Sequence, residues 1–144
     1  MKLEDLLKRY GSNTTSNFDL MKIAKDLKIK PFYYVMKDEV EDLKNTKDNV
    51  IYVCTNLHDS DEPGVHHSCF VWDKSNIDNN YFFDSYGLPP VQEVKDLLEH
   101  ATYNTFKIQK RGTRICGQLC MFVLHQLKNG EDFLDIILSL KNVD

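Results

Sequence analysis

Residues 116–127 of the chain, Cys-Gly-Gln-Leu-Cys-Met-Phe-Val-Leu-His-Gln-Leu, decide which fold we expect. The stretch is apolar on nearly every side of a helix, and a helix of this kind lies buried inside a domain. Gly130 follows it and is the residue type that most often ends a helix. We therefore predict a buried central helix that begins at Cys116, with the other elements packed around it.

The rest of the chain predicts helices at both ends and strands between them. The helical spacing of apolar residues predicts helices over residues 3–10, 20–27, 91–98 and 131–140. Runs of β-branched and aromatic residues predict an extended stretch over 32–36 and strands over 50–55, 67–72, 81–84 and 105–109. A turn is expected over 58–64, and Ser16 and Asp19 have the spacing of a helix-capping pair. The expected order is helices, then mostly antiparallel strands, then helices again, which is typical of an α+β domain.

Length and composition are those of one ordinary globular domain. The chain has 144 residues, of which 42% are hydrophobic and 28% charged. The net charge of −4 excludes a strongly basic surface that coats nucleic acid. No apolar run approaches the roughly 18 residues that span a bilayer, so we expect no membrane contact. Acidic residues at the N-terminus replace the apolar centre of a secretion signal, so we expect a protein that is not secreted.

The four cysteines lie in two kinds of surroundings. Cys54, Cys69 and Cys120 lie in apolar runs and are typical of small buried packing residues in a reducing compartment. Cys116 instead lies between Arg114 and Gly117 at the expected helix start, where free N–H groups favour a thiolate. Packing is the alternative role for Cys116, because most free cysteines are packing residues. The surroundings make Cys116 the candidate nucleophile.

A cysteine nucleophile needs a base, a group that orients the base, and donors for the oxyanion. His66 and His67 enter a strand together, and adjacent strand residues face opposite sides, so we expect at most one of them to face a given site. Asp84 ends a strand after three aromatic residues and could orient a base or form a turn. Gln109 ends the next predicted strand, where its amide could donate to an oxyanion.

In order and spacing these residues resemble the adenain-like cysteine proteases, the group of the adenovirus maturation protease and the SUMO-deconjugating enzymes. Gly-Val-His at 64–66 followed by Trp72, the seven positions from Gln109 to Cys116, and the segment 116–125 look like the adenoviral enzyme. Asp-Ser-Tyr-Gly-Leu-Pro-Pro within 81–90, together with 32–39, looks closer still to the maturation proteases of virophages and Polinton-type elements. The resemblance covers roughly residues 32–127.

The resemblance implies a role for each matching residue. It implies four catalytic residues: the nucleophile Cys116, the general base His66, its orienting acid Asp84 and the oxyanion donor Gln109. It implies three substrate-binding residues, His67, Trp72 and Gly117, and no metal ligand. The chain departs from the family at His67, where the family has a Trp that walls the channel for small residues.

The resemblance also implies a fold and an activity. The fold is a compact cysteine-protease fold, in which a mixed, mostly antiparallel sheet packs against the buried helix that carries the nucleophile at its N-terminus. Residues 1–144 are then a single cysteine-protease domain, with an N-terminal helical segment over 1–31 and the catalytic core over 32–144. The activity is cleavage after small residues, of the Gly-Gly or Gly-X-Gly type, because a narrow slot admits only hydrogen as a side chain. The substrates are viral capsid precursors, cut during virion maturation in the virion and in the virus factory of the infected cytoplasm.

Three alternatives remain open. A deubiquitinating or SUMO-type deconjugating protease, acting on ubiquitin-like proteins of a host, would use the same catalytic residues. A zinc-stabilised binding module would use His66, Cys69, Cys116 and Cys120, although this set lacks the tight Cys-x-x-Cys turns of structural zinc sites. An inactive relative serving as a scaffold is the third, and the presence of all four catalytic residue types weighs against it.

The expected partner is a polypeptide substrate, and we expect a monomer that requires no cofactor. A viral peptide and DNA assist the adenoviral enzyme. The negative net charge of this chain disfavours activation by DNA, because sliding along DNA depends on Lys and Arg contacts to phosphates. Activation by a peptide stays open.

Overall fold

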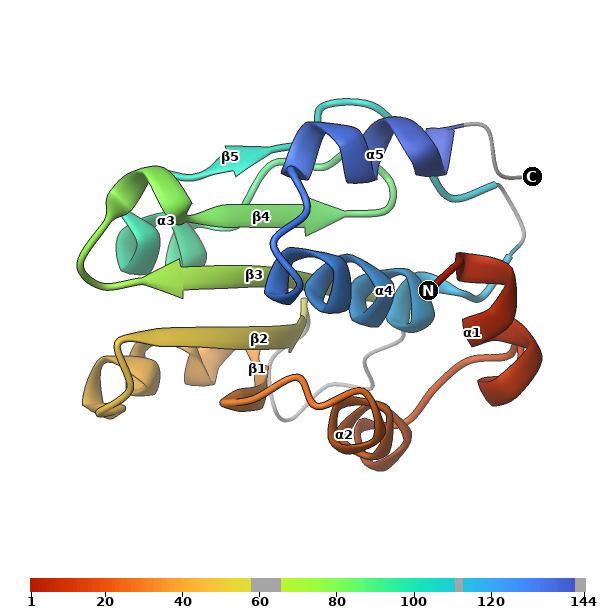
Figure 1. Ribbon diagram of the computed structural model, residues 1–144. Helices are drawn as coiled ribbons and strands as arrows, with labels where there is room; N and C mark the ends of the chain where they lie inside the picture. Colours follow the sequence, from red (N-terminus) through yellow and green to blue (C-terminus); the bar gives the residue numbers. More distant parts are fainter. Residues whose placement is uncertain (58–65, 111–112, 142–144) are drawn as a thin grey trace.

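A five-stranded mixed sheet runs through the structure, a computed structural model that describes residues 1–57, 66–110 and 113–141 (Figure 1). Its strands lie side by side in chain order: β1 Phe32–Met36, β2 Val50–Asn56, β3 His67–Asp73, β4 Tyr81–Asp84 and β5 Thr102–Tyr103. The edge pairs β1–β2 and β4–β5 are parallel, whereas β2–β3 and β3–β4 are antiparallel. The turn predicted over 58–64 lies outside the described residues.

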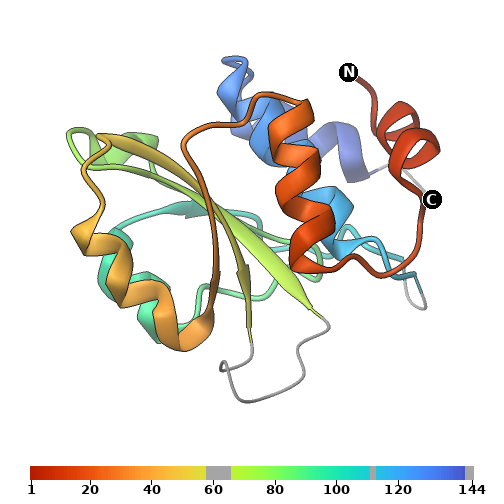
Figure 2. The same ribbon diagram turned by 90° about the horizontal axis from the view of Figure 1, so that it is seen from below.

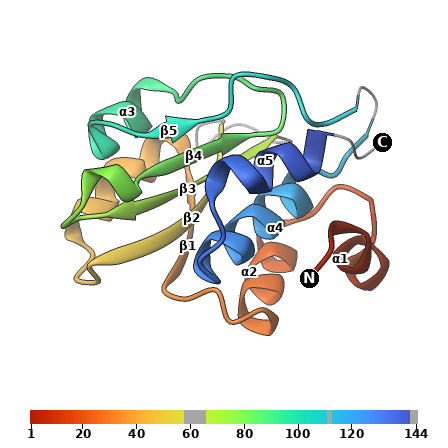
Figure 3. The same ribbon diagram turned by 45° about the horizontal axis from the view of Figure 1, so that its top comes forward.

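Helices cover both faces of this sheet (Figure 2, Figure 3). The α-helices are α1 Leu3–Tyr10, α2 Asn17–Asp26, α3 Gln92–Leu98, α4 Cys116–Lys128 and α5 Phe133–Lys141, and the 3-10 helices are η1 Lys37–Asn45 and η2 Ile77–Asn79. α2, α4 and α5 lie on one face, with α1 packed against α4, and α3 and η1 lie on the other. Within the described residues no helix is both long and apolar enough to cross a bilayer.

An apolar core fills the space on each face of the sheet. In β3, Cys69 and Val71 point into the core that contains α4, whereas Phe70 points into the core that contains α3, because successive strand residues face opposite sides. Every residue of α4 over 116–124 is buried, and each fully buried Leu or Phe stabilises the fold by about 1.5–3 kcal/mol. The predicted buried central helix is therefore confirmed.

The N-terminal helices begin and end where local chemistry predicts. The backbone N–H of Asp19 donates to Ser16 Oγ at 3.1 Å, and the backbone N–H of Ser16 donates to Asp19 Oδ2 at 2.8 Å. These two bonds form the predicted capping box at the start of α2. α1 ends at Gly11, whose φ of 89° is a left-handed conformation that glycine adopts without steric cost.

The strand predicted over 105–109 is wrong, because the hydrogen bonds of this segment go to the end of β4. The backbone N–H groups of Ile108 and Gln109 both donate to the carbonyl of Ser85 at 2.8 Å. The side-chain amide of Asn104 donates to the carbonyl of Asp84 at 2.7 Å. The short strand β5 comes earlier in the chain, and the segment after it follows an irregular path beside the candidate site.

Candidate active site

Cys116 is the first residue of α4, and only 6% of its surface is exposed. Ile115 occupies the N-cap position, and its apolar side chain cannot accept a hydrogen bond from the N–H groups at the helix start. These N–H groups carry the positive end of the helix dipole, which favours a negative charge on the sulfur. The structure thus places Cys116 at the helix start where the sequence predicts it.

His66 and Asp84 form a hydrogen-bonded pair. His66 Nε2 lies 2.9 Å from Asp84 Oδ2, and the side chain of Asp84 is 1% exposed. The second oxygen, Asp84 Oδ1, accepts a hydrogen bond from the backbone N–H of Tyr86 at 2.7 Å. The Tyr86 ring also stacks on the imidazole of His66, with ring centroids 4.9 Å apart. The carboxylate and the tyrosine together hold the His66 ring in one orientation.

His67 also reaches the sulfur, which contradicts the expectation that only one of the two histidines faces the site. His67 Nδ1 lies 3.9 Å from Cys116 Sγ, and a hydrogen bond also joins His66 to Cys116. The alternation of side chains applies only within a strand, and β3 begins at His67. His66 precedes the strand, so its side chain is free to turn toward the same sulfur.

The pKa values of Cys116 and His66 move in opposite directions. Burial alone would raise the pKa of the Cys116 thiol, but hydrogen bonds from His66 and His67 outweigh it and lower the pKa to about 6. Burial alone would lower the pKa of His66, but hydrogen bonds to Asp84 and Cys116 outweigh it and raise the pKa to about 9. Between about pH 6 and pH 9 the site therefore holds a thiolate beside an imidazolium.

The other three cysteines have different surroundings. Cys54, Cys69 and Cys120 are buried on the α4 side of the sheet, and burial raises the pKa of each thiol. A protonated thiol is a poor nucleophile. The thiol of Cys116 therefore differs from the other three in the direction of its pKa shift, and its role as the nucleophile stays a prediction.

Gln109 is buried, and its side-chain amide is hydrogen-bonded at both ends. Its Nε2 donates to the carbonyl of Thr113 at 2.7 Å, and its Oε1 accepts from Ser85 Oγ at 2.6 Å. These bonds tie the segment before α4 to the end of β4. The amide nitrogen carries a second hydrogen, so its role as an oxyanion donor stays a prediction.

Trp72 does not lie with the other predicted residues. It is five positions along β3 from His67, which is roughly 16 Å at about 3.3 Å per residue. Its side chain packs on the core with α3, on the face opposite α4, and Lys74 Nζ lies 4.9 Å from its ring centroid. The assignment of Trp72 to substrate binding beside Cys116 is not supported by this placement.

Gly117 lies against the chain segment that leads into α2. A Cβ at this position would overlap Thr15 Oγ1 and lie 3.1 Å from Leu20 Cδ2 and 3.5 Å from His67 Nδ1. The missing side chain therefore lets α2 and His67 approach the first turn of α4 closely. Gly117 builds the site, and its predicted contact with substrate stays a prediction.

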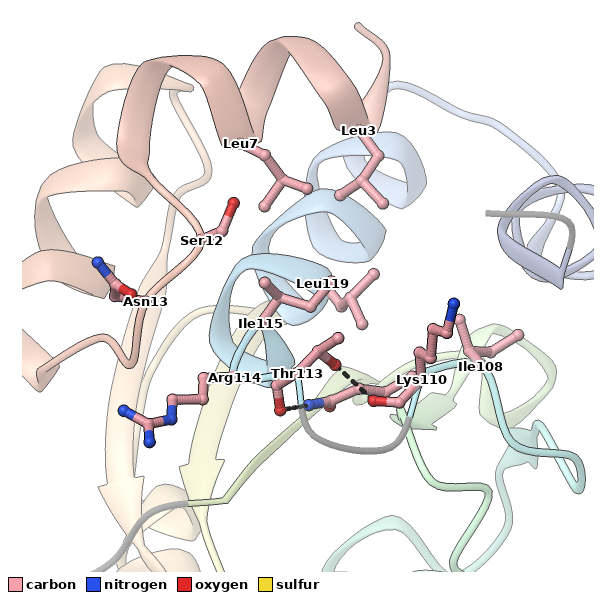
Figure 4. A pocket seen from close by; sticks show the side chains of 11 residues that line it. Leu3, Leu7, Ser12, Asn13, Ile108, Lys110, Thr113, Arg114, Ile115 and Leu119 are labelled. Carbon is pink, nitrogen blue, oxygen red and sulfur yellow. Dashed lines mark hydrogen bonds between the residues drawn. The ribbon is translucent and has the colours of Figure 1, made fainter. Parts of the chain in front are cut away.

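Two cavities adjoin the site. One, of about 390 Å³, lies between α1 and the segment before α4, and Leu3 and Leu7 face Ile115 and Leu119 across it (Figure 4). It is also lined by Gln109 and by the cationic side chains of Lys110 and Arg114. The other, of about 450 Å³, is polar and is lined by His67 and by a set of residues from β1, η1, β2 and the start of α2 with the two residues before it: Thr15, Ser16, Asn17, Tyr34, Met36, Glu39 and Asn56.

Three residues of the site escaped the sequence analysis. Tyr34 Oη lies 2.9 Å from His67 Nε2, Tyr86 stacks on His66, and Asn104 accepts a hydrogen bond from the backbone N–H of Asp84 at 3.1 Å. Aromatic residues and asparagines in these segments are equally typical of strands and turns. Nothing in their local pattern marks them, and the fold alone brings them to the site.

No family model and no curated protein matches this chain in sequence. Among solved structures, the chain is similar to the selenomethionine form of ASFV pS273R protease, with a TM-score of 0.59 and 15% sequence identity. The aligned region covers 87% of this chain and 62% of that protease, so the chain spans less than two thirds of its length. The predicted compact α+β cysteine-protease fold is thereby confirmed at the level of the fold. Among the described residues, no three His, Cys, Asp or Glu side chains could hold a metal ion together.

Proposed function

We propose that this protein is a cysteine endopeptidase with Cys116 as its nucleophile. One observation carries the proposal: the buried sulfur at the start of α4 is hydrogen-bonded to His66, which is also hydrogen-bonded to the buried carboxylate of Asp84. A nucleophile, a base that hydrogen-bonds it and a group that orients the base are the parts that thiol proteases need. The likeness in fold to a viral protease supports the same proposal.

In the first half-reaction the Cys116 thiolate attacks the carbonyl carbon of the scissile peptide bond. The electron pair of the carbonyl moves to its oxygen, and the backbone N–H of Cys116 and the amide of Gln109 donate hydrogen bonds to this oxyanion. When the intermediate collapses, the C–N bond breaks and the His66 imidazolium gives its proton to the leaving amine. The products are a free amine, a thioester on Cys116 and a neutral His66.

In the second half-reaction water releases the acyl group. Neutral His66 takes one proton from water as the oxygen attacks the thioester carbon. The C–S bond then breaks, which frees a carboxylic acid and restores the Cys116 thiolate beside the His66 imidazolium. Asp84 keeps the His66 ring in place through both steps, because its carboxylate is buried and fully committed to His66 and Tyr86.

The proposed substrates are viral capsid precursors, cut after small residues of the Gly-Gly or Gly-X-Gly type. The family resemblance of the motifs around Cys116 and the likeness to a viral protease support this substrate class. We propose that cleavage takes place in the virion and in the infected cytoplasm and needs no cofactor. Activity on ubiquitin-like proteins is the competing outcome.

The test is incubation of the purified chain with candidate capsid precursors and with ubiquitin-like substrates, with cut sites read by mass spectrometry. Cys116→Ala removes the nucleophile and is expected to lower cleavage by roughly 10⁴-fold or more. Cys54→Ala is the matched control, because it removes a buried thiol outside the site and should leave the cut sites unchanged. Cleavage by Cys116→Ala at the rate of the unmodified chain would overturn the proposal.

A further inference from the structure

A second imidazole contacts the proposed nucleophile, and the His66–Asp84 pair leaves its role unexplained. His67 is 2% exposed, and each of its ring nitrogens has one polar neighbour. Nδ1 lies 3.9 Å from Cys116 Sγ, and Nε2 lies 2.9 Å from Tyr34 Oη. Because the buried ring lies between a thiol and a phenol, the neighbour that donates a hydrogen bond decides which ring nitrogen carries the proton.

The hydrogen-bond network makes Tyr34 the donor to His67. Burial raises the pKa of the Tyr34 hydroxyl, so the phenol keeps its proton at neutral pH. A hydrogen bond also joins the side chains of Asn56 and Tyr34. His67 Nδ1 faces the sulfur, and a thiolate has no hydrogen to donate, so Nδ1 must carry a proton to hydrogen-bond it. In the tautomer with its proton on Nδ1, Nε2 is an acceptor, and the Tyr34 hydroxyl is placed to donate to it.

Several titratable groups lie around His67. His66 hydrogen-bonds the same sulfur. Asp84 is committed to His66, and the thiols of Cys54 and Cys120 have pKa values raised by burial. Glu39 lines the same polar cavity and accepts a hydrogen bond from the backbone N–H of Met36.

We propose that His67 Nδ1–H donates a hydrogen bond to the Cys116 thiolate, and that Tyr34, held by Asn56, fixes the tautomer of His67 that makes this possible. The inference rests on the proposed function, because it takes Cys116 as the nucleophile. His67 contacts the reacting sulfur and is a catalytic residue, whereas Tyr34 acts through His67 and is a positioning residue. The sulfur is thus held by two imidazole donors, His66 and His67.

The hydrogen bonds from Tyr34 to His67 and from His67 to Cys116 form a relay. This relay predicts a defined effect for removal of the Tyr34 hydroxyl. In Tyr34→Phe the ring of His67 is free to carry its proton on Nε2, which turns a lone pair toward the sulfur and withdraws one donor from the thiolate. Hydrogen bonds to charged groups are the stronger ones, so we expect the alkylation rate of Cys116 at pH 5, well below the midpoint, to fall about tenfold. The midpoint of the alkylation curve should move up by about one pH unit.

The experiment follows alkylation of Cys116 by iodoacetamide across pH 5–10, with the site read by mass spectrometry. Tyr33→Phe is the matched control, because it removes a hydroxyl on the opposite face of β1, where Tyr33 Oη donates to Asp48. His67→Leu should shift the curve at least as far as Tyr34→Phe. His67→Asn should restore most of the reactivity, because the amide nitrogen of asparagine can occupy the place of Nδ1.

The outcomes separate this inference from the proposed function. If Tyr34→Phe and His67→Leu titrate like the unmodified chain, the relay is wrong whether or not the protein cleaves peptides. If His67→Asn is as slow as His67→Leu, packing rather than an N–H donor explains His67, and the inference also fails. If the relay variants behave as expected but no polypeptide is cut, the proposed endopeptidase is wrong and the activated thiol stands. In peptide cleavage, Tyr34→Phe should lower kcat and leave KM unchanged.

Discussion

At the residue scale, the reactivity of Cys116 is set by a competition between burial and hydrogen bonding. Burial penalises the thiolate, and two imidazoles more than compensate for it. The same competition at Cys54 ends the other way, because no imidazole contributes to its shift and burial raises its pKa. Four residues of one type thus differ in chemistry because of their neighbours alone.

The first prediction is a bell-shaped pH dependence. As pH rises through about 6 the Cys116 thiol ionises, and as it rises further through about 9 the His66 imidazolium loses its proton. Cleavage should therefore rise near pH 6, stay high and fall near pH 9, and kcat/KM measured across this range checks it. Alkylation of Cys116 should follow only the acid limb, because it needs the thiolate and not the proton of His66.

Asp84→Asn provides the control for the alkaline limb. It removes the carboxylate that raises the pKa of His66, so the fall near pH 9 should move to lower pH. Two results together would contradict the thiolate–imidazolium pair of Cys116 and His66: a kcat/KM that rises only near the ordinary cysteine pKa, and alkylation of all four cysteines at similar rates.

At the scale of elements, the site depends on how closely α2 approaches the first turn of α4. Gly117 offers no side chain, and Thr15 and Leu20 occupy the space that a Cβ would need. The capping box at Ser16 holds the start of α2 in this position. The polar cavity and the His67 ring therefore share one wall whose position depends on a single glycine.

The second prediction is that Gly117→Ala destabilises this junction. Its Cβ would overlap Thr15 Oγ1, and overpacking of this kind costs about 1–3 kcal/mol. Denaturant unfolding measures the loss. Thr15→Ala removes the overlapping oxygen, which is buried without a hydrogen-bond partner among the described residues, so the double variant should recover part of the stability. A double variant no more stable than Gly117→Ala alone would show that the overlap is not the cause.

At the scale of the whole molecule, the N-terminal helices α1 and α2 belong to the same core as α4, the helix that begins at Cys116. Leu6 of α1 is completely buried, and it shares a core with Leu20 of α2 and Leu119 of α4. The side chain of Gln118 donates to the carbonyls of Gly11 and Asn13 at 3.1 and 2.7 Å, which ties the loop between α1 and α2 to α4. These contacts predict that residues 1–31 and the rest of the chain unfold together.

The third prediction tests this with Leu6→Ala. Loss of a fully buried leucine costs about 2–5 kcal/mol, and one cooperative transition should shift as a whole. Leu138→Ala on α5 is the control, because that side chain is 46% exposed and should change stability little. Two separate transitions, with only one of them moved by Leu6→Ala, would mean that the N-terminal helices form their own unit.

The sequence by itself determined the elements and the kind of chemistry. Helix and strand periods are local, so the apolar pattern of 116–127 and the capping spacing of Ser16 and Asp19 could be read directly. The contrast between Cys116 and the other cysteines was equally local. The apolar pattern of 105–109 predicts a strand. The backbone N–H groups of Ile108 and Gln109 instead donate to the carbonyl of Ser85, which is distant in the chain and which a local pattern does not identify.

Only the tertiary structure decided which distant residues meet at the sulfur. Tyr34 reaches His67 because β1 pairs with β2 in the register Tyr34–Cys54, and β2 pairs with β3 in the register Cys54–Cys69. Trp72, by contrast, lies in the same strand as His67, five residues farther along β3, and its side chain faces the other core. Register and layer packing arise from contacts across the whole chain, and a local pattern does not contain them.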